Sequence, residues 1–427
     1  MQTHLAPEFV GTREGQAAEA ILRKCVHCGF CTATCPTYQL LGDELDGPRG
    51  RIYLIKQVLE GAPVTEKTQQ HLDRCLTCRN CESTCPSGVQ YGSLVEIGRQ
   101  IVDEKVPRQG RDKAVRWLLK EGLTSPLFKP AMAVGKLVKP LLPAALKKKV
   151  PGATPPRAGL WPTRQHARKV LMLAGCVQPA MMPNINSATA RVLDACGIQT
   201  LVAEDAGCCG AIRAHLNDHE GGLADMRRNI DAWWSMLQSG QVEAIVMNAS
   251  GCGVTVKEYA QHLAHDPEYA ERARLVSEKT RDLSELLPEL MPRLKKLLGG
   301  ASGTAVASRR GTVAYHPPCT LQHGQKLRGG VETHLRDLGL PIEVAACESP
   351  LCCGSAGTYS VLQPELSTQL RDRKLGHLGT LKPRTILSAN IGCIQHLQSG
   401  TDTPVQHWVE LIDDMLAACA GPEDLRT

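Results

Sequence analysis

The sequence predicts a mixed α and β protein of several domains, with a helical cysteine-rich domain followed by two homologous α/β units. Three observations predict this fold. The pattern Cys-x2-Cys-x2-Cys-x3-Cys-Pro occurs twice near the N-terminus, helical segments surround it, and the second half repeats an order of strand, cysteine and helix. The length of 427 residues suits two or three domains with ordinary cores.

The first domain, expected over residues 1–110, contains both cysteine runs. Their pattern is that of bacterial ferredoxins, in which the fourth cysteine of each run ligates the other run's cluster. We therefore expect a double [4Fe–4S] ferredoxin domain, with one cluster on Cys25, Cys28, Cys31 and Cys85 and the other on Cys75, Cys78, Cys81 and Cys35. Structural zinc is the alternative, but a zinc site needs four ligands and does not explain a repeated three-plus-one pattern with a proline after each fourth cysteine.

Helices, rather than compact strand hairpins, are expected to hold these two cysteine loops. They are predicted at residues 17–24, 51–60, 68–74 and 94–104. Four arginines lie near the runs and could offset negative cluster charge, although solvated helix faces explain each of them equally well: Arg49, Arg51, Arg74 and Arg79.

Residues 111–168 are expected to form a linker rich in proline and basic residues. Prolines recur between residues 125 and 168, and Lys147 to Lys149 form a basic run. A short amphipathic portion at 127–146 could touch anionic lipid or a partner subunit, but such a stretch is more often a solvated connector.

From residue 169 the chain repeats itself, with a first Cys-Cys-Gly unit expected over 169–298 and a second over 311–418. Strands are predicted at 169–173, 199–203 and 243–247, and again at 312–315, 342–345 and 384–388. Helical segments separate them, for example 187–195, 221–237 and 364–375. This alternation is typical of an open parallel sheet, whose loops at the carboxyl ends of the strands converge on one crevice.

Eight cysteines lie just past the ends of these strands, at matching positions of the two units. Buried apolar thiols would not explain this repetition in register. We therefore expect two sets of metal or redox ligands, each holding up to one further iron–sulfur cluster: Cys176, Cys208, Cys209 and Cys252, and Cys319, Cys352, Cys353 and Cys393.

The remaining cysteines and the histidines give weaker signals. Cys196, Cys347 and Cys419 have no repeat partner and are interpreted as core or surface thiols. Four histidines near the cysteines could ligate or move protons, although a lone histidine is more often packed or solvated: His27, His316, His323 and His396. His396 lies three residues after Cys393, where a ligand could fall.

Several classes of function lack support in the sequence. The N-terminus has no signal-type apolar region and no run of eighteen apolar residues exists, so we expect reduced thiols and no membrane span. The net charge of +6 is mild and gives no reason to expect a nucleic-acid partner. We find no Gly-x-Gly-x-x-Gly after a strand, no Walker loop and no Ser/His/Asp signature, so we expect no catalytic residue for the substrate on this chain.

The doubled ferredoxin run, the Pro-Arg-Gly-Arg loop at 48–51 and the two Cys-Cys-Gly units together resemble a family of iron–sulfur subunits of bacterial dehydrogenases. Residues 25–51, 229–234, 318–323 and 352–359 look most like the glycolate oxidase (glycolate dehydrogenase) branch. The resemblance implies an electron-transfer subunit of a complex that oxidises glycolate to glyoxylate. It also implies flavin on partner flavoprotein subunits, and a membrane acceptor such as quinone at the cytoplasmic face of the bacterial inner membrane.

The same resemblance leaves alternatives open. Related subunits serve lactate or glycerol-3-phosphate dehydrogenases, and heterodisulfide reductase relatives reduce a disulfide at a five-thiolate cluster. Those relatives end each unit in Cys-x2-Cys, whereas this sequence has Ala249 and Asn390 three residues before Cys252 and Cys393. Four cysteines per unit still suffice for one ordinary cluster.

Overall fold

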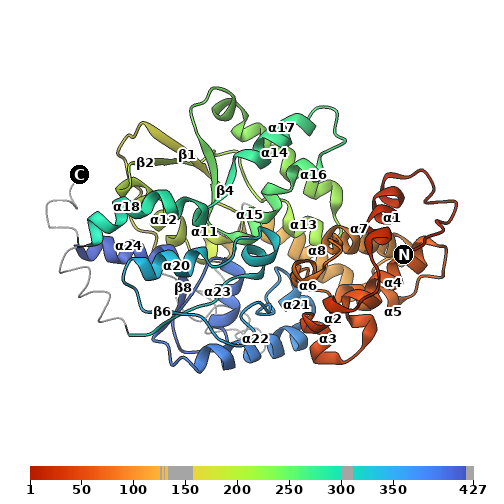
Figure 1. Cartoon of the computed structure of the whole chain (residues 1–427). Helices are drawn as coiled ribbons and strands as arrows, with labels where there is room; N and C mark the ends of the chain where they lie inside the picture. Colours follow the sequence, from red (N-terminus) through yellow and green to blue (C-terminus); the bar gives the residue numbers. More distant parts are fainter. Residues whose placement is uncertain (126, 129, 133–156, 300–310, 420–427) are drawn as a thin grey trace.

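The computed structural model describes residues 1–125, 127–128, 130–132, 157–299 and 311–419. Most of the predicted amphipathic stretch at 127–146 lies outside these residues, as does the basic run at 147–149. Figure 1 shows the helical N-terminal domain on one side of the two α/β units. The predicted order of a helical cysteine domain followed by two parallel α/β units is confirmed.

The N-terminal domain consists of short helices around two cysteine loops. All four predicted helices are present, with small shifts at their ends, among α1 (Arg13–Lys24), α2 (Phe30–Ala33), α3 (Pro36–Leu41), η1 (Glu44–Asp46), α4 (Pro48–Leu59), α5 (Glu66–Asp73), α6 (Asn80–Thr84) and α7 (Tyr91–Lys105). Leu22, Ile55, Leu59 and Leu94 are buried between them. This core fixes the helices whose ends carry the cysteines.

The range expected as a linker begins with a helix, α8 (Gly110–Thr124), that connects the two parts of the molecule. Arg116 pairs with Asp73 of the N-terminal domain at 3.1 Å, and Glu121 pairs with Arg213 of the first α/β unit at 2.9 Å. None of its residues is fully buried. Because charged contacts rather than an apolar stripe hold α8, hydrophobic periodicity gave no sign of it.

Two four-stranded parallel sheets follow, with the same topology. The first has the order β2-β1-β3-β4 and the second β6-β5-β7-β8. All six predicted strands are present, as β1 (Arg168–Met172), β2 (Ile198–Leu201), β3 (Ala244–Met247), β5 (Val313–Tyr315), β6 (Ile342–Glu343) and β7 (Thr385–Ser388). The edge strands β4 (Thr280–Asp282) and β8 (Val405–His407) were not predicted, because three residues are too few for a periodic signal.

Helices cover both sheets. The first unit contains α11 (Gln178–Met181), α12 (Asn184–Ala195), α13 (Ala211–His215), α14 (His219–Gln238), α15 (Ser250–Lys257), α16 (Tyr259–His262), α17 (Ala270–Lys279), η3 (Leu283–Leu286) and α18 (Leu287–Leu298). The second contains the π-helical turn η4 (Thr320–Gly324), α20 (Gly330–Asp337), α21 (Tyr359–Leu362), α22 (Pro364–Gly379), α23 (Ile391–Gln398) and α24 (Trp408–Cys419).

The two units share one hydrophobic core. Val170 of the first sheet and Val313 of the second belong to the same buried cluster. Helix α12 packs against α24, where Arg191 pairs with Asp413 at 2.6 Å. The repeat therefore forms a joined pair rather than two separate domains.

The N-terminal domain docks on both units. Arg79 donates to Glu258 of the first unit at 2.9 Å, and Tyr359 of the second unit donates its hydroxyl to the carbonyl oxygen of Arg74 at 3.1 Å. Helix α3 contacts α22, and α6 contacts η4.

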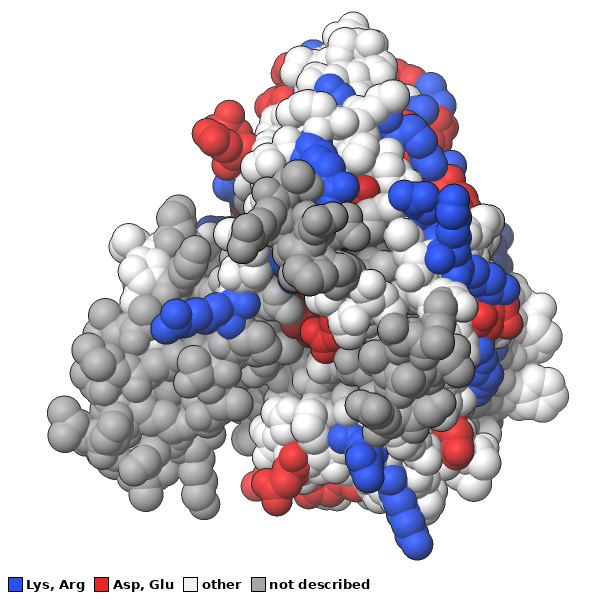
Figure 2. All heavy atoms as spheres, turned by 90° about the vertical axis from the view of Figure 1, so that its left-hand side faces the viewer, with Lys and Arg blue, Asp and Glu red and all other residues white. Residues whose placement is uncertain are grey.

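Charges of both signs are mixed on the face turned away from the N-terminal domain. Figure 2 shows Lys and Arg scattered among Asp, Glu and uncharged residues on the described part of this face. The net charge of +6 is therefore not collected there into one basic stripe. Among the described helices, none is long and apolar enough to cross a membrane.

Candidate functional site

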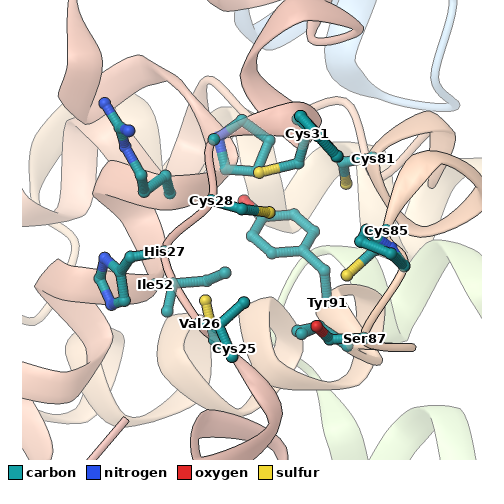
Figure 3. Close-up of a pocket in the computed structure, with 16 residues that line it drawn as sticks. Cys25, Val26, His27, Cys28, Cys31, Ile52, Cys81, Cys85, Ser87 and Tyr91 are labelled. Atoms are coloured by element: carbon teal, nitrogen blue, oxygen red, sulfur yellow. The ribbon is translucent and has the colours of Figure 1, made fainter.

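The first predicted cluster site is a pocket between the two cysteine loops. It is partly open to solvent, and its lining includes Cys25, Cys28, Cys31 and Cys85. Figure 3 shows these four sulfurs gathered around it. Cys28 is exposed, and so are its apolar neighbours Val26 and Phe30 (67% and 60%). One side of this pocket therefore opens to the surface.

The second predicted set lies deeper in the molecule. Burial raises the pKa of the Cys81 thiol well above its usual range, and the nearby thiols of Cys78, Cys75 and Cys35 add to this shift. The predicted set is therefore brought together. Cys81 also lines the first pocket, so the two sites adjoin.

Both loops use the same unusual backbone to place their cysteines. Two and four residues after the first cysteine of each run, φ is positive, at His27 and Gly29 in one loop and at Thr77 and Arg79 in the other. Three of these four are not glycine, and Thr77 is β-branched, so the conformation is strained. The strained turn directs the Thr77 amide at the Cys75 sulfur, 3.4 Å away.

Two buried arginines, Arg51 and Arg99, lie beside Cys75 of the second cysteine set. Arg51 is 1% exposed and donates to the carbonyl oxygen of His71 at 2.7 Å, and Arg99 donates to that of Cys75 at 2.6 Å. Burial alone would raise the pKa of the Cys75 thiol, but these two guanidinium groups bring it below its ordinary value. Arg99 was missed in the sequence because it lies in a different helix from the cysteines.

All four predicted arginines have acidic partners, and that of Arg51 is Asp46, at 3.4 Å. Arg49 pairs with Glu44 at 2.7 Å and Arg74 with Asp46 at 2.8 Å. Arg79 holds Glu258 across the domain boundary. Of these four arginines, Arg51 is the one that is fully buried, and the thiols of Cys75 and Cys35 are among its neighbours.

In the first Cys-Cys-Gly unit the four predicted cysteines meet at the carboxyl ends of the strands. The sulfurs of Cys176 and Cys208 lie 3.6 Å apart, and Cys208 and Cys252 both raise the pKa of the Cys209 thiol. Two side chains fix the loop: Asn229 donates to the carbonyl oxygen of Cys208 at 2.7 Å, and Tyr259 donates to that of Cys209 at 2.9 Å.

Gly210 completes the turn of this loop at a φ of 94°. A Cβ atom there would lie 2.8 Å from the carbonyl oxygen of Gly222 on α14. The close approach of loop and helix therefore requires glycine.

The second unit gathers its four predicted cysteines in the same way. The sulfurs of Cys319 and Cys352 lie 3.7 Å apart. The pKa of the Cys353 thiol is raised well above its usual range; contact with the Cys352 thiol lowers this pKa, whereas contact with the Cys393 thiol and burial raise it. Asn390, three residues before Cys393, donates its amide to the Cys393 sulfur at 3.6 Å.

Polar side chains surround these four thiols. His316 is 1% exposed, and one of its ring nitrogens lies within 4.8 Å of the Cys353 and Cys393 sulfurs. Lys374 is 3% exposed, bonds the carbonyl oxygens of Glu348 and Ser349, and lies near Cys352 and Cys353. Burial lowers the pKa of His316 well below its usual value, and the Lys374 charge adds to this effect, so the imidazole is neutral.

The second unit also touches the second ferredoxin set. Cys78 packs against a buried cluster that contains Cys319, Cys352 and Leu76. After burial, the Cys319 thiol is the largest influence on the pKa of Cys78, which it raises. Three of the four cysteine sites therefore form a row: the first ferredoxin set at the exposed pocket, the second ferredoxin set, and the thiols of the second unit.

The remaining cysteines and histidines lie apart from these sets or have partners. Cys347 is exposed, whereas Cys196 and Cys419 pack against the shared core.

His27 contacts the sulfur of Met1, and His396 contacts Ser367 at 3.1 Å. His323 bonds Ser83 at 2.9 Å across the domain boundary. Of the four predicted histidines, His316 is thus the one beside the thiols without a partner.

The donor sets suit iron–sulfur clusters. Each site offers four thiols close together, which is the usual ligation of a [4Fe–4S] cluster. Backbone amides and buried cations near the sulfurs complement the negative charge of a thiolate-bound cluster.

Comparison with known proteins agrees with this geometry. Residues 21–89 match the 4Fe-4S dicluster domain, so this part of the chain holds two such clusters. Residues 170–257 and 313–398 each match the cysteine-rich domain. These matches coincide with the two ferredoxin-type loops and with the two parallel-sheet units.

Two relatives match over nearly the whole chain, and a third matches over a little more than half of it. The glycolate oxidase iron-sulfur subunit of Escherichia coli (strain K12) is 53% identical, over 97% of this chain and 99% of that protein. The probable glycolate oxidase iron-sulfur subunit of Bacillus subtilis (strain 168) is 30% identical, over 90% of each. Lactate utilization protein A of Bacillus pumilus (strain SAFR-032) is 26% identical, over 57% of this chain and 99% of that protein. By this similarity and by its arrangement of cysteine sites, the chain belongs to the family of glycolate oxidase iron–sulfur subunits.

Proposed function

We propose that this chain is the electron-transfer subunit of a flavin-dependent complex that oxidises glycolate to glyoxylate. The observation that carries the proposal is the row of cysteine sites, in which Cys81 joins the first two and Cys78 reaches the third. Bound iron–sulfur clusters would supply reversible one-electron transfer along such a row. Taking a hydride from an alcohol requires a flavin, which we place on the partner flavoprotein subunits.

The proposed ligand sets follow the gathered thiols. Cys25, Cys28, Cys31 and Cys85 hold one [4Fe–4S] cluster, and Cys35, Cys75, Cys78 and Cys81 hold the other. Each Cys-Cys-Gly unit holds one further iron–sulfur cluster on its own four cysteines. We also propose that the ferredoxin-type domain spans residues 1–110 and that the two Cys-Cys-Gly units span residues 169–298 and 311–418.

We place the electron donor at the exposed pocket. Cys28 reaches the surface there between Val26 and Phe30, and a flavoprotein docked on this apolar patch would approach the first cluster site closely. The acceptor is a membrane electron carrier, for which quinone is our choice. The complex would lie at the cytoplasmic face of the bacterial inner membrane without a span from this chain.

The patch can be tested by changing Phe30→Asp in the full chain. A buried charge at the contact would weaken co-purification of the flavoprotein subunits and lower glycolate-dependent reduction of the clusters, while the iron content stays unchanged. Leu160→Asp is the matched control, since Leu160 is also an exposed apolar residue (87%) but lies outside the N-terminal domain. Equal loss in both variants would contradict the proposed docking site.

The function itself is tested by anaerobic EPR on the purified complex. Glycolate should produce the signals of reduced clusters, whereas lactate and glycerol 3-phosphate should not. The isolated, flavin-free chain should not oxidise glycolate. Reduction by lactate or glycerol 3-phosphate instead would replace the substrate, and glycolate oxidation by the isolated chain would overturn the carrier role.

A further inference from the structure

The second Cys-Cys-Gly unit contains a buried imidazole without a hydrogen-bond partner. His316 directly follows strand β5 and is 1% exposed, and neither of its ring nitrogens has a partner among the described residues. Buried polar groups are nearly always satisfied, and an exception indicates a missing ion or water. A bound ion or water molecule would therefore supply the partner that the ring of His316 lacks.

The surroundings of His316 identify the kind of ligand. One ring nitrogen and the sulfurs of Cys353 and Cys393 all lie within 4.8 Å of one another. Two protein donors on one tetrahedral iron, at bond lengths of about 2.0–2.3 Å, lie roughly 3.5–4 Å apart, so small movements bring the imidazole and one of these sulfurs into range of the same iron. Cys319 and Cys352, 3.7 Å apart, complete the group of thiols.

The fold does not require a histidine at this place. With the 143-residue offset that relates Cys176 to Cys319, the equivalent of His316 is Leu173 in the first unit. Leu173 is 3% exposed and packs in the same apolar cluster as Cys209. An apolar side chain therefore fits this position, and the second unit has a polar donor instead.

We propose that His316 is an imidazole ligand of the iron–sulfur centre that the four cysteines of the second unit hold. This inference rests on the proposed function, because it assumes that the unit binds iron and sulfide. An imidazole brings no negative charge to the iron, unlike a thiolate, so its coordination favours a higher reduction potential, as histidine ligation does in Rieske [2Fe–2S] centres. The second unit would then differ chemically from the first, which offers thiols alone.

Pulsed EPR on the reduced, anaerobically purified complex tests this ligation. Protein labelled with ¹⁵N-histidine should show the nuclear coupling of a metal-bound nitrogen changed from the ¹⁴N to the ¹⁵N pattern. The coupling should vanish in His316→Leu, which reproduces the residue of the first unit. It should persist in His396→Gln, the matched control, because His396 lies near Cys393 but bonds Ser367.

A second variant covers a failure of His316→Leu to fold. His316→Cys replaces the imidazole by a thiolate, and it should keep the iron, lose the nitrogen coupling and lower the reduction potential of one centre. The labelling experiment on the unaltered chain also decides the question alone. Absence of any histidine nitrogen coupling would overturn the inference.

Metal analysis separates failure of this inference from failure of the proposed function. The iron content per chain is compared between the unaltered complex and the double variant Cys352→Ser, Cys353→Ser. Loss of iron in the variant, but no histidine coupling in the unaltered complex, overturns only the ligation by His316. No loss of iron, or zinc in place of iron, overturns both the cluster in this unit and the ligand.

Discussion

The two Cys-Cys-Gly units have the same topology but different surroundings for their thiols. In the first unit Leu173 and Ile230 are buried near the cysteines, and the cluster that contains Cys209 and Cys252 consists of residues from this unit. In the second unit, His316 and Lys374 occupy the equivalent positions, at offsets of 143 and 144 residues. There the thiols pack against Cys78 of the ferredoxin-type domain.

This difference separates what the fold needs from what the function needs. The turn with glycine at positive φ, Gly210 or Gly354, is present in both units and brings each pair of adjacent cysteines to the sheet edge. At these equivalent positions, the buried cation and the imidazole without a partner are present in the second unit and not in the first. We infer that the second unit exchanges electrons with the ferredoxin-type domain, and that the first supports it or passes electrons onward.

The largest expected effect comes from removing one thiol in each unit. Cys352→Ser should lower the rate of glycolate-dependent electron transfer to the acceptor by roughly 100-fold or more. Loss of a residue that only hydrogen-bonds a metal ligand already lowers metal affinity or activity by about 10–100-fold. Cys208→Ser should reduce the rate less, because the buried cluster against which Cys78 packs contains thiols of the second unit and none of the first. Steady-state rates with a quinone analogue, normalised to the iron content, measure this difference.

The order of these two effects is the critical result. Equal losses would show that both units lie on the path of the electrons. A larger loss in Cys208→Ser would reverse the assignment of the second unit. Cys347→Ser is the control, since Cys347 is exposed and outside both sets.

A smaller effect is expected from replacing the buried cation by its counterpart, in Lys374→Ile. The carbonyl oxygens of Glu348 and Ser349 lose their donor, which should lower the free energy of unfolding by about 1–3 kcal/mol. Loss of the positive charge near Cys352 and Cys353 should also lower the reduction potential of the centre in this unit. Denaturant unfolding and a redox titration followed by EPR measure the two effects.

The equivalent position of the first unit provides the control. Ile230→Met keeps the volume and adds no charge, so it should cost less than about 1.5 kcal/mol and leave every potential unchanged. An unchanged potential in Lys374→Ile would show that the ammonium group serves packing and hydrogen bonding alone.

The sequence predicts the parts of the site that depend on local spacing. Two loops and two strand-end sets follow from the intervals between cysteines, because a short interval limits where the next thiol can lie. The partners from distant helices do not follow from it. Arg99, Lys374 and the contact of Cys78 with Cys319 join residues that are far apart in the chain, and no local pattern marks them.

The roles of the predicted arginines and the two edge strands that were not predicted also depend on residues that are distant in the sequence. Arg74 and Arg79 lie near the cysteine runs in sequence, but Asp46 and Glu258 determine what they do. The edge strands β4 and β8 gain their place from pairing with β3 and β7 rather than from their own composition.

The smallest expected effect tests whether the first unit supports the docking of the ferredoxin-type domain. Arg79 and Glu258 form an ion pair across this boundary and are only 16% and 23% exposed. Arg79→Ala should lower the free energy of unfolding by about 1–2 kcal/mol, between the values for exposed and fully buried pairs. Hydrogen exchange should quicken in α6 and in η4, which Ser83 and His323 join across the neighbouring boundary with the second unit.

Arg23→Ala is the matched control for this change. Arg23 pairs with Glu19 within helix α1, and its side chain is 66% exposed, so its loss should cost at most about 0.5 kcal/mol and leave exchange at the boundary unchanged. If Arg79→Ala also slows electron transfer while Cys208→Ser does not, the first unit acts by holding Cys78 against the second unit. If Arg79→Ala leaves exchange in α6 and η4 unaltered, contacts with the second unit alone hold the domain, and the supporting role of the first unit is refuted.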